Sequence, residues 1–157
     1  MKILIGADKG GFRLKEAIAL HLKEQGVEFE DLGTLDPEHP RDFTSIATDV
    51  ASAISEGRAE RGILVCGTGM GMAVTANKFK SVRAAVVESQ YAAAYSRKIN
   101  DANVLCLGGF IIGDTMGCEI ADAFLNTGFV EGFPQWRVDF LNSQKALLAE
   151  LETKNFK

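Results

Sequence analysis

The chain alternates short apolar runs with longer amphipathic stretches, and this alternation constrains the fold more than any other feature. The apolar runs are bounded by glycine or polar residues and are typical of buried strands: Lys2–Ala7, Val27–Leu32, Gly62–Cys66, Ser81–Val87 and Ala102–Leu107. Three of the stretches between and after them repeat apolar residues at helical spacing: Phe12–Gln25, Thr44–Glu56 and Asp114–Asn126. Three more are predicted to be helical: the stretch that follows Gly71 and extends to about Phe79, Ser89–Ile99 and Gln135–Glu152. Strands that alternate with helices predict an α/β fold with a five-stranded parallel sheet covered on both faces.

Length and composition set the class of protein. The 157 residues suit one domain, which we expect to span 1–152, with 153–157 as a frayed tail. A net charge of −4 argues against a nucleic-acid binder that works by bulk charge, and no apolar run reaches the length of a membrane span. We therefore expect a cytoplasmic chain. Three cysteines without a CxxC pair argue against a disulfide framework, and two histidines without local partners exclude a histidine-rich metal site.

Ligands of a parallel sheet bind at the carboxyl ends of its strands. Three glycine-rich stretches occupy such positions: 6–11, 66–71 and 108–113. In the second, glycines let backbone N–H groups converge on an anion or a developing oxyanion, and the same groups favour a thiolate at Cys66. A base beside an oxyanion cradle is what proton abstraction next to a carbonyl requires. A buried, inert Cys66 is an equally good interpretation of these residues alone.

Two nucleotide-binding motifs can be tested against the same stretch. A dinucleotide fingerprint that starts at Gly67 or Gly69 needs its third glycine at position 72 or 74, where Met72 and Val74 stand. A Walker P-loop needs Gly-Lys-Ser or Gly-Lys-Thr, and neither occurs. Both interpretations are therefore disfavoured.

Four segments together resemble the RpiB/LacAB family of sugar isomerases: KILIGADKGGFRLKEAI, ILVCGTGMGMAVTANK, VRAAVV and NDANVLCLGG. The resemblance extends from Lys2 to about Val138. It implies a Rossmann-like three-layer α/β/α sandwich. It also implies aldose–ketose isomerisation through a cis-enediolate, without metal or cofactor. Homodimers or tetramers with active sites at the subunit interface are expected.

The resemblance also assigns roles residue by residue. Cys66 would move the proton between the two reacting carbons, Thr68 would assist ring opening, and Asp8 would contact sugar hydroxyls. Asn100, from the neighbouring subunit, would bind near the reacting carbons. The amides that would stabilise the enediolate belong to Gly67, Gly69, Met70 and Gly71. Asp8 has a structural alternative as the cap of the helix that begins near Gly11.

Departures from the family pattern bear on the substrate. Ile99 replaces a histidine assigned to ring opening, and Glu88 replaces another. Phe110 and Phe133 stand where the family has arginines that hold phosphate, and Pro134 replaces the histidine beside the second. Arg137 matches, and Lys9, in place of a histidine, supplies a point charge; both are candidate substrate ligands, although Lys9 is also typical of a solvated surface.

The sequence thus predicts an aldose–ketose isomerase acting on a small sugar phosphate of the ribose-5-phosphate kind, with Cys66 as base. Two alternatives remain open. The enzyme could isomerise an unphosphorylated acidic sugar such as a keto-uronate, which is linear and needs no ring opening. The chain could instead be a non-catalytic sugar-binding subunit of a two-component isomerase.

Overall fold

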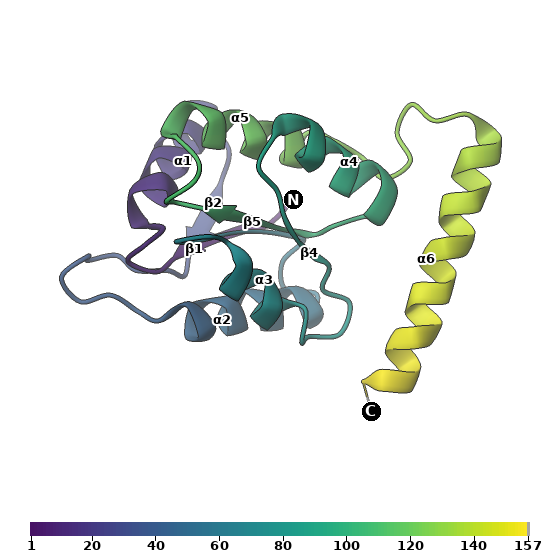
Figure 1. Ribbon diagram of the computed structural model, residues 1–157, viewed down its shortest axis with the longest axis horizontal. Coiled ribbons are helices and arrows are strands. Elements are labelled where there is room, and N and C mark those ends of the chain that lie inside the picture. The colour runs from purple at the N-terminus through teal and green to yellow at the C-terminus, as the bar shows by residue number, and fades with distance from the viewer. Residues whose placement is uncertain (157) are drawn as a thin grey trace.

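The computed structural model describes residues 1–156 and has the expected α/β architecture, a five-stranded all-parallel sheet flanked by helices (Figure 1). Its elements, in chain order, are β1 (Ile3–Ala7), α1 (Phe12–Glu24), β2 (Phe29–Asp31), α2 (Phe43–Ser55), β3 (Arg61–Cys66), α3 (Met70–Ala76), β4 (Ala84–Val86), α4 (Gln90–Asn100), β5 (Val104–Gly108), α5 (Asp114–Leu125) and α6 (Gln135–Asn155). Every predicted strand and helix is present, with ends displaced by at most three residues.

The strand order is β2-β1-β3-β5-β4, which the sequence did not predict. β3 lies at the centre and pairs with β1 on one side and β5 on the other. The register sets Ala7 opposite Val65 and Cys66 opposite Gly108. The carboxyl ends of these three strands therefore lie level with one another. β2 and β3 lie on opposite sides of β1, so the order of the strands changes direction between β1 and β3. Ligands of open α/β sheets bind at such a point.

Two apolar cores hold the layers together. One face of the sheet packs on α1, α4 and α5, with Leu14, Ile18 and Phe124 fully buried or nearly so. The other face packs on α2 and α3 through residues such as Val50 and Met72. Strands buried on both faces explain the nearly continuous apolar runs of the sequence.

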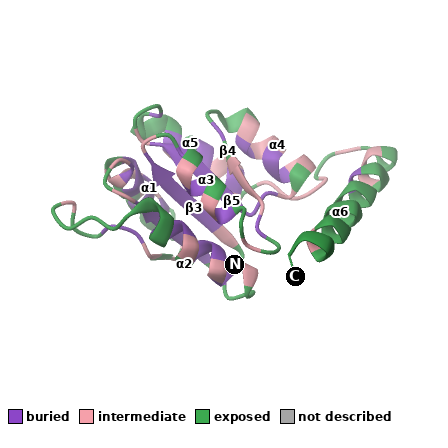
Figure 2. Cartoon of the chain, turned by 60° about the horizontal axis from the view of Figure 1, so that its bottom comes forward, coloured by how far each residue is buried: buried purple, intermediate pink, exposed green. Residues whose placement is uncertain are grey.

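The last helix, α6, stands apart from these layers (Figure 1). Leu141 is its buried residue, and Figure 2 shows most of its length exposed. The helix continues to Asn155 rather than ending at Glu152, and the N–H of Phe156 still donates to the Glu152 carbonyl at 2.8 Å. Of the tail expected to fray, residues 153–155 are thus helical, and Lys157 lies outside the described residues. No helix within residues 1–156 has the length and apolarity to span a bilayer.

Candidate active site

Three loops meet where β1, β3 and β5 end. The N–H of Asp8 donates to the carbonyl of Val65 at 3.3 Å, which ties the first loop to the end of β3. The N–H of Gly109 donates to the carbonyl of Cys66 at 2.7 Å and binds the third loop to the second. The approach is so close that a Cβ on Gly109 would overlap the backbone of Gly10. The glycines of these loops therefore let three strand ends form one surface.

Cys66 ends β3 inside this surface. Its side chain is 5% exposed, and the N–H of Gly69 donates to its Sγ at 3.1 Å. Gly69 can direct its N–H backwards because it adopts a left-handed conformation with φ of +79°, which glycine accepts at little cost. An N–H aimed at sulfur stabilises negative charge there. Cys66 thus combines the burial that is typical of an inert cysteine with a hydrogen bond that a thiolate base could accept.

The neighbouring candidates line the same edge. Thr68 is exposed, and its Oγ1 accepts the N–H of Met70 at 3.4 Å. Asp8 is half-buried, and its Oδ1 accepts the N–H of Gly11 at 3.0 Å. Gly11 is itself the N-cap residue of α1, which has no side-chain cap, so Asp8 closes the turn before the helix rather than capping it. This contact uses one of the two carboxylate oxygens. Lys9 is exposed in the same loop.

Two phenylalanine rings flank the second loop. The Phe110 ring lies against Gly67 and Gly10, and the Phe43 ring lies against Gly71. Phe110 stands out in the sequence only as a departure from the family pattern, and nothing in the sequence singles out Phe43. Phe43 begins α2, and no local pattern shows that this helix start faces the glycine loop.

Asn100 is not brought to Cys66 within one chain. It is the last residue of α4, which runs back from the end of β4 to the start of β5, so it lies at the amino ends of the strands. The turn after it is held by Asp101, whose carboxylate accepts hydrogen bonds from Arg97 at 2.8 Å and from Lys145 at 2.6 Å. Burial opposes ionisation of Asp101, but these hydrogen bonds outweigh it and lower its pKa.

Arg137 also lies away from the glycine loops. It belongs to the first turn of α6, and its guanidinium carbon lies 4.0 Å from the centroid of the Phe133 ring. Phe133 in turn packs edge-on against Tyr95 of α4. In Figure 1, α6 stands at the side of the sheet opposite the loop that joins β2 to α2. One chain therefore places Asp8 and Cys66 at one end of the molecule and Asn100 and Arg137 at the other.

Asn77, from the ANK segment, has a structural role. Its side-chain Nδ2 donates to the carbonyl of Ala84 at 2.9 Å, and its Oδ1 accepts the N–H of Ala84 at 2.8 Å. The amide thus pairs with both backbone groups of the first residue of edge strand β4. This contact explains the residue without a substrate.

The other two thiols have surroundings unlike those of Cys66. Complete burial raises the pKa of the Cys106 thiol, and the neighbouring Cys66 raises it further. Partial burial and then the carboxylates of Asp122 and Asp114 raise the pKa of Cys118. Neither thiol is favoured as a thiolate at neutral pH.

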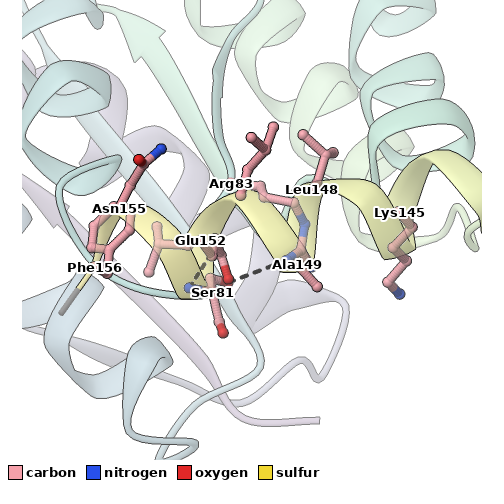
Figure 3. A pocket seen from close by; sticks show the side chains of 10 residues that line it. Ser81, Arg83, Lys145, Leu148, Ala149, Glu152, Asn155 and Phe156 are labelled. Atoms are coloured by element: carbon pink, nitrogen blue, oxygen red, sulfur yellow. Dashed lines mark hydrogen bonds between the residues drawn. The ribbon is translucent and has the colours of Figure 1, made fainter.

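Cavities along α6 belong to the packing of that helix. One of about 450 Å³ lies between α6 and the segment that precedes β4, and Figure 3 shows Glu152 there accepting the N–H of Ser81 at 2.9 Å. Another of about 490 Å³ is lined by Asn100, Phe140 and Leu148, among others. Within a single chain α6 is therefore incompletely packed.

Comparison with known proteins gives a consistent family. Residues 3–141 match the model of the family described as Ribose/Galactose Isomerase. A 4-deoxy-4-sulfo-D-erythrose isomerase of Clostridium sp. (strain MSTE9) is 52% identical over 97% of this chain and 96% of its own length. A ribose-5-P isomerase B of Listeria innocua is 39% identical over 99% of both chains. A D-erythrulose-4-phosphate isomerase of Pectobacterium atrosepticum is 40% identical over 84% of this chain and 87% of its own.

A solved structure supports the fold independently. The ribose-5-phosphate isomerase B of Clostridium thermocellum superposes with a TM-score of 0.87 at 39% identity, over 98% of this chain and 99% of that one. The shared architecture extends over the helices and the sheet, so the strand ends and loops described above have counterparts in a sugar isomerase.

Proposed function

The chain belongs to the ribose/galactose isomerase (RpiB/LacAB) family and is an aldose–ketose isomerase, and we propose that its substrate is a four-carbon sugar with a terminal sulfonate. The observation that carries the proposal is the high identity, over nearly the whole chain, to a relative named for 4-deoxy-4-sulfo-D-erythrose. The full-length matches to named isomerases also weigh against a non-catalytic subunit.

The chemistry of such a sugar fits the departures of this sequence. In 4-deoxy-4-sulfo-erythrose, carbon 4 carries sulfur instead of a hydroxyl, so no oxygen can close a five-membered ring on carbon 1. The aldehyde is open-chain, and its isomerase needs no acid–base group for ring opening. Ile99, in place of the family histidine, is compatible with that substrate. Ribose 5-phosphate, in contrast, closes a ring through its free 4-hydroxyl.

The reaction is a proton transfer between adjacent carbons. The Cys66 thiolate removes the proton from carbon 2 of the aldose, and the electron pair moves onto the carbonyl oxygen to give a cis-enediolate. The proton on sulfur then goes to carbon 1, while the hydroxyl proton of carbon 2 passes to the oxygen of carbon 1, and the ketose results. Backbone N–H groups of Gly67 to Gly71 stabilise the negative oxygens, and Asp8 binds the remaining hydroxyls. Thr68 lies at the mouth, where its hydroxyl can bond a substrate oxygen.

A second copy of the chain completes this site in our proposal. Asn100 of the partner subunit binds near the reacting carbons, and Arg137 of the partner subunit binds the acidic end. Two observations support a homodimer, alone or paired into a tetramer. Asn100 and Arg137 lie at the opposite end of the chain from Cys66, and α6 exposes large apolar residues: Trp136, Phe140, Leu147, Leu148 and Leu151. Exposed apolar surface of this kind marks an interface.

A sugar phosphate remains the second candidate substrate. Two relatives are named for the phosphorylated sugars ribose 5-phosphate and erythrulose 4-phosphate. The four-carbon phosphate is also open-chain, because its terminal oxygen is esterified. A linear keto-uronate would likewise bypass ring opening, so it belongs in any substrate panel.

The test is turnover by the purified protein on a panel of matched sugars, with EDTA present. The panel is 4-deoxy-4-sulfo-erythrose, erythrose 4-phosphate, ribose 5-phosphate and a 4-deoxy-5-ketouronate. We expect the highest kcat/KM for the sulfonate and incorporation of solvent deuterium at the reacting carbons. Cys66→Ala should abolish turnover, whereas the matched control Cys118→Ala should retain it.

Each outcome on the panel has a distinct meaning. Higher kcat/KM for ribose 5-phosphate than for both four-carbon sugars would overturn the proposal on chain length. Higher kcat/KM for erythrose 4-phosphate than for the sulfonate would overturn it on the acidic group. Full activity of Cys66→Ala would remove the thiol from the mechanism.

A further inference from the structure

The position of Phe110 is fixed by the backbone. Its N–H donates to the carbonyl of Gly67 at 3.0 Å, and its ring lies on Gly67 so closely that a Cβ there would stand 2.6 Å from Cε2. The same ring edge reaches Gly10, whose Cβ would lie 3.3 Å from Cζ. Phe110 therefore bridges the loop that carries Asp8 and Lys9 to the loop that carries Cys66.

The outer face of this ring is open. Phe110 is 79% exposed, so no residue of its own chain covers this face. Such exposure is unusual for a phenyl ring. Phe43, 40% exposed, lies against Gly71 at the other end of the loop. The two rings therefore present apolar surface at both ends of the loop that follows Cys66, and this surface offers a ligand no hydrogen bonds in place of water.

The charges near this edge are few. Two arginines there are already paired, Arg13 with Asp114 and Arg41 with Asp49 at 2.6 Å. Lys9 has no carboxylate partner among residues 1–156. With Arg137 of the partner subunit in place, the two cations of the site are balanced by the Asp8 carboxylate and the Cys66 thiolate, so the site has no surplus positive charge.

A site with apolar walls and no surplus positive charge treats singly and doubly charged ligands differently. The cost of removing an ion from water grows with the square of its charge, so a dianion costs roughly four times as much as a monoanion of similar size. A sulfonate carries one negative charge, whereas a phosphate monoester carries nearly two at pH 7. The site has no additional cation to pair with the second negative charge of the phosphate.

We propose that Phe110 is the specificity-determining residue for the acidic end of the substrate, and that its ring selects a singly charged sulfonate over a doubly charged phosphate. The inference rests on the proposed function and adds to it the residue that sets the choice. An arginine at the same position could project from the same backbone and form paired hydrogen bonds with a phosphate.

The experiment compares two substrates that differ in the end group alone, 4-deoxy-4-sulfo-erythrose and erythrose 4-phosphate. For Phe110→Arg we expect the ratio of kcat/KM for sulfonate to that for phosphate to fall at least tenfold, through KM for the phosphate. Leu20→Arg adds the same charge on the exposed face of α1, which belongs neither to the candidate site nor to the proposed subunit interface, and should leave the ratio unchanged. Phe110→Leu keeps an apolar side chain and should also leave the ratio within about threefold of wild type.

The pH dependence of the wild-type ratio gives a second readout. The second pKa of a phosphate monoester is about 6, so erythrose 4-phosphate becomes a monoanion as the pH falls from 7.5 to 5.5. The ratio should move towards the phosphate over that range, because protonation of the enzyme affects both substrates alike. In Phe110→Arg this movement should be absent or reversed.

Failure of this inference differs from failure of the proposed function. If wild type favours the sulfonate but Phe110→Arg leaves the ratio unchanged, Phe110 does not set the specificity and the inference is wrong. If Leu20→Arg shifts the ratio as much as Phe110→Arg, the effect is one of overall charge and the inference again fails. If wild type turns over neither four-carbon substrate, the proposed function itself is wrong.

Discussion

Cysteines on adjacent strands differ in what surrounds their sulfur atoms. Cys66 ends β3 and receives the N–H of Gly69, whereas Cys106 sits within β5 in an apolar core. The sequence alone left an inert and a reactive Cys66 equally supported, because burial statistics favour an inert cysteine whereas the glycine-rich turn after it favours a reactive one. The hydrogen bond from the N–H of Gly69, a glycine with a left-handed backbone, is the observation that favours the reactive interpretation in our proposal.

Alkylation should reveal this difference directly. Burial raises the pKa of Cys106, so we expect it to stay unlabelled by iodoacetamide until the protein is unfolded. Cys118, whose pKa is raised by partial burial and nearby carboxylates, should label slowly at pH 7.5 and faster above pH 9. Labelling of Cys66 should slow when substrate is present. Mass spectrometry of the three peptides reports each rate, and rapid labelling of Cys106 in the folded protein would contradict the burial argument.

Gly69→Ala should separate catalysis from stability. An alanine at φ of +79° costs roughly 1–2 kcal/mol, and its Cβ would stand 3.0 Å from the Leu107 carbonyl carbon, which turns the amide away from Cys66. We expect kcat to fall by at least tenfold while the free energy of unfolding falls by about 2 kcal/mol. Gly26→Ala is the matched control, because φ there is +71° and nothing lies within 4 Å of the added Cβ. Equal kcat in the two variants would show that the amide is dispensable.

At the scale of elements, local sequence patterns predict which helices and strands form, but not which of them lie next to each other. The sequence pattern located every helix and strand, because both faces of the sheet are buried and the helices that cover it, unlike α6, pack apolar side chains on the strands. The order β2-β1-β3-β5-β4 depends on long-range pairing and left no mark in the sequence. The contact of Phe43 with Gly71 likewise joins residues far apart in the sequence, and no local pattern predicts it. The position of Asn100, in contrast, follows from its place before β5, since that end of a parallel strand is opposite the ligand edge.

The end of α4 depends on Asp101, and its charge should matter more than its shape. Arg97 is buried and pairs with Asp101, so Asp101→Asn should lower the free energy of unfolding by about 3 kcal/mol at pH 7. Asparagine tolerates the left-handed φ of +50° at this position, so the backbone is not the cause. Because the folded pKa is lowered, this stabilisation is present above about pH 3.9, the unfolded value, and is lost as the pH falls through the folded pKa.

Urea unfolding between pH 3 and pH 7 checks this prediction. The difference between Asp101→Asn and wild type should be largest at neutral pH and should shrink below pH 4. Asp36→Asn is the comparison, since its pKa is also lowered, by a hydrogen bond from His39, but its carboxylate is exposed. A constant difference at all pH values would place the effect in packing rather than in charge.

The whole molecule divides its chemistry between two ends. Asp8, Cys66 and the glycine loops lie at the carboxyl ends of the strands, while Asn100 and Arg137 lie beyond the amino ends. The helix that carries Arg137 exposes apolar residues to solvent along its length (Figure 2). Under the proposed function a chain so arranged is incomplete alone, and a two-fold pairing would bring the two sets together twice in each dimer.

Subunit complementation tests that arrangement. Cys66→Ala and Asn100→Ala should each be nearly inactive alone, because each damages both sites of its own dimer. Unfolded together and refolded as a mixture, half of the dimers should be mixed, and each mixed dimer has one site with both residues intact. Activity should therefore return to about a quarter of wild type. A mixture of Cys66→Ala with Gly69→Ala, whose defects lie in one chain's half of the site, should recover almost nothing beyond the residual rate of Gly69→Ala. Recovery in that control, or its absence in the first mixture, would mean that the two residues do not share a site across the interface.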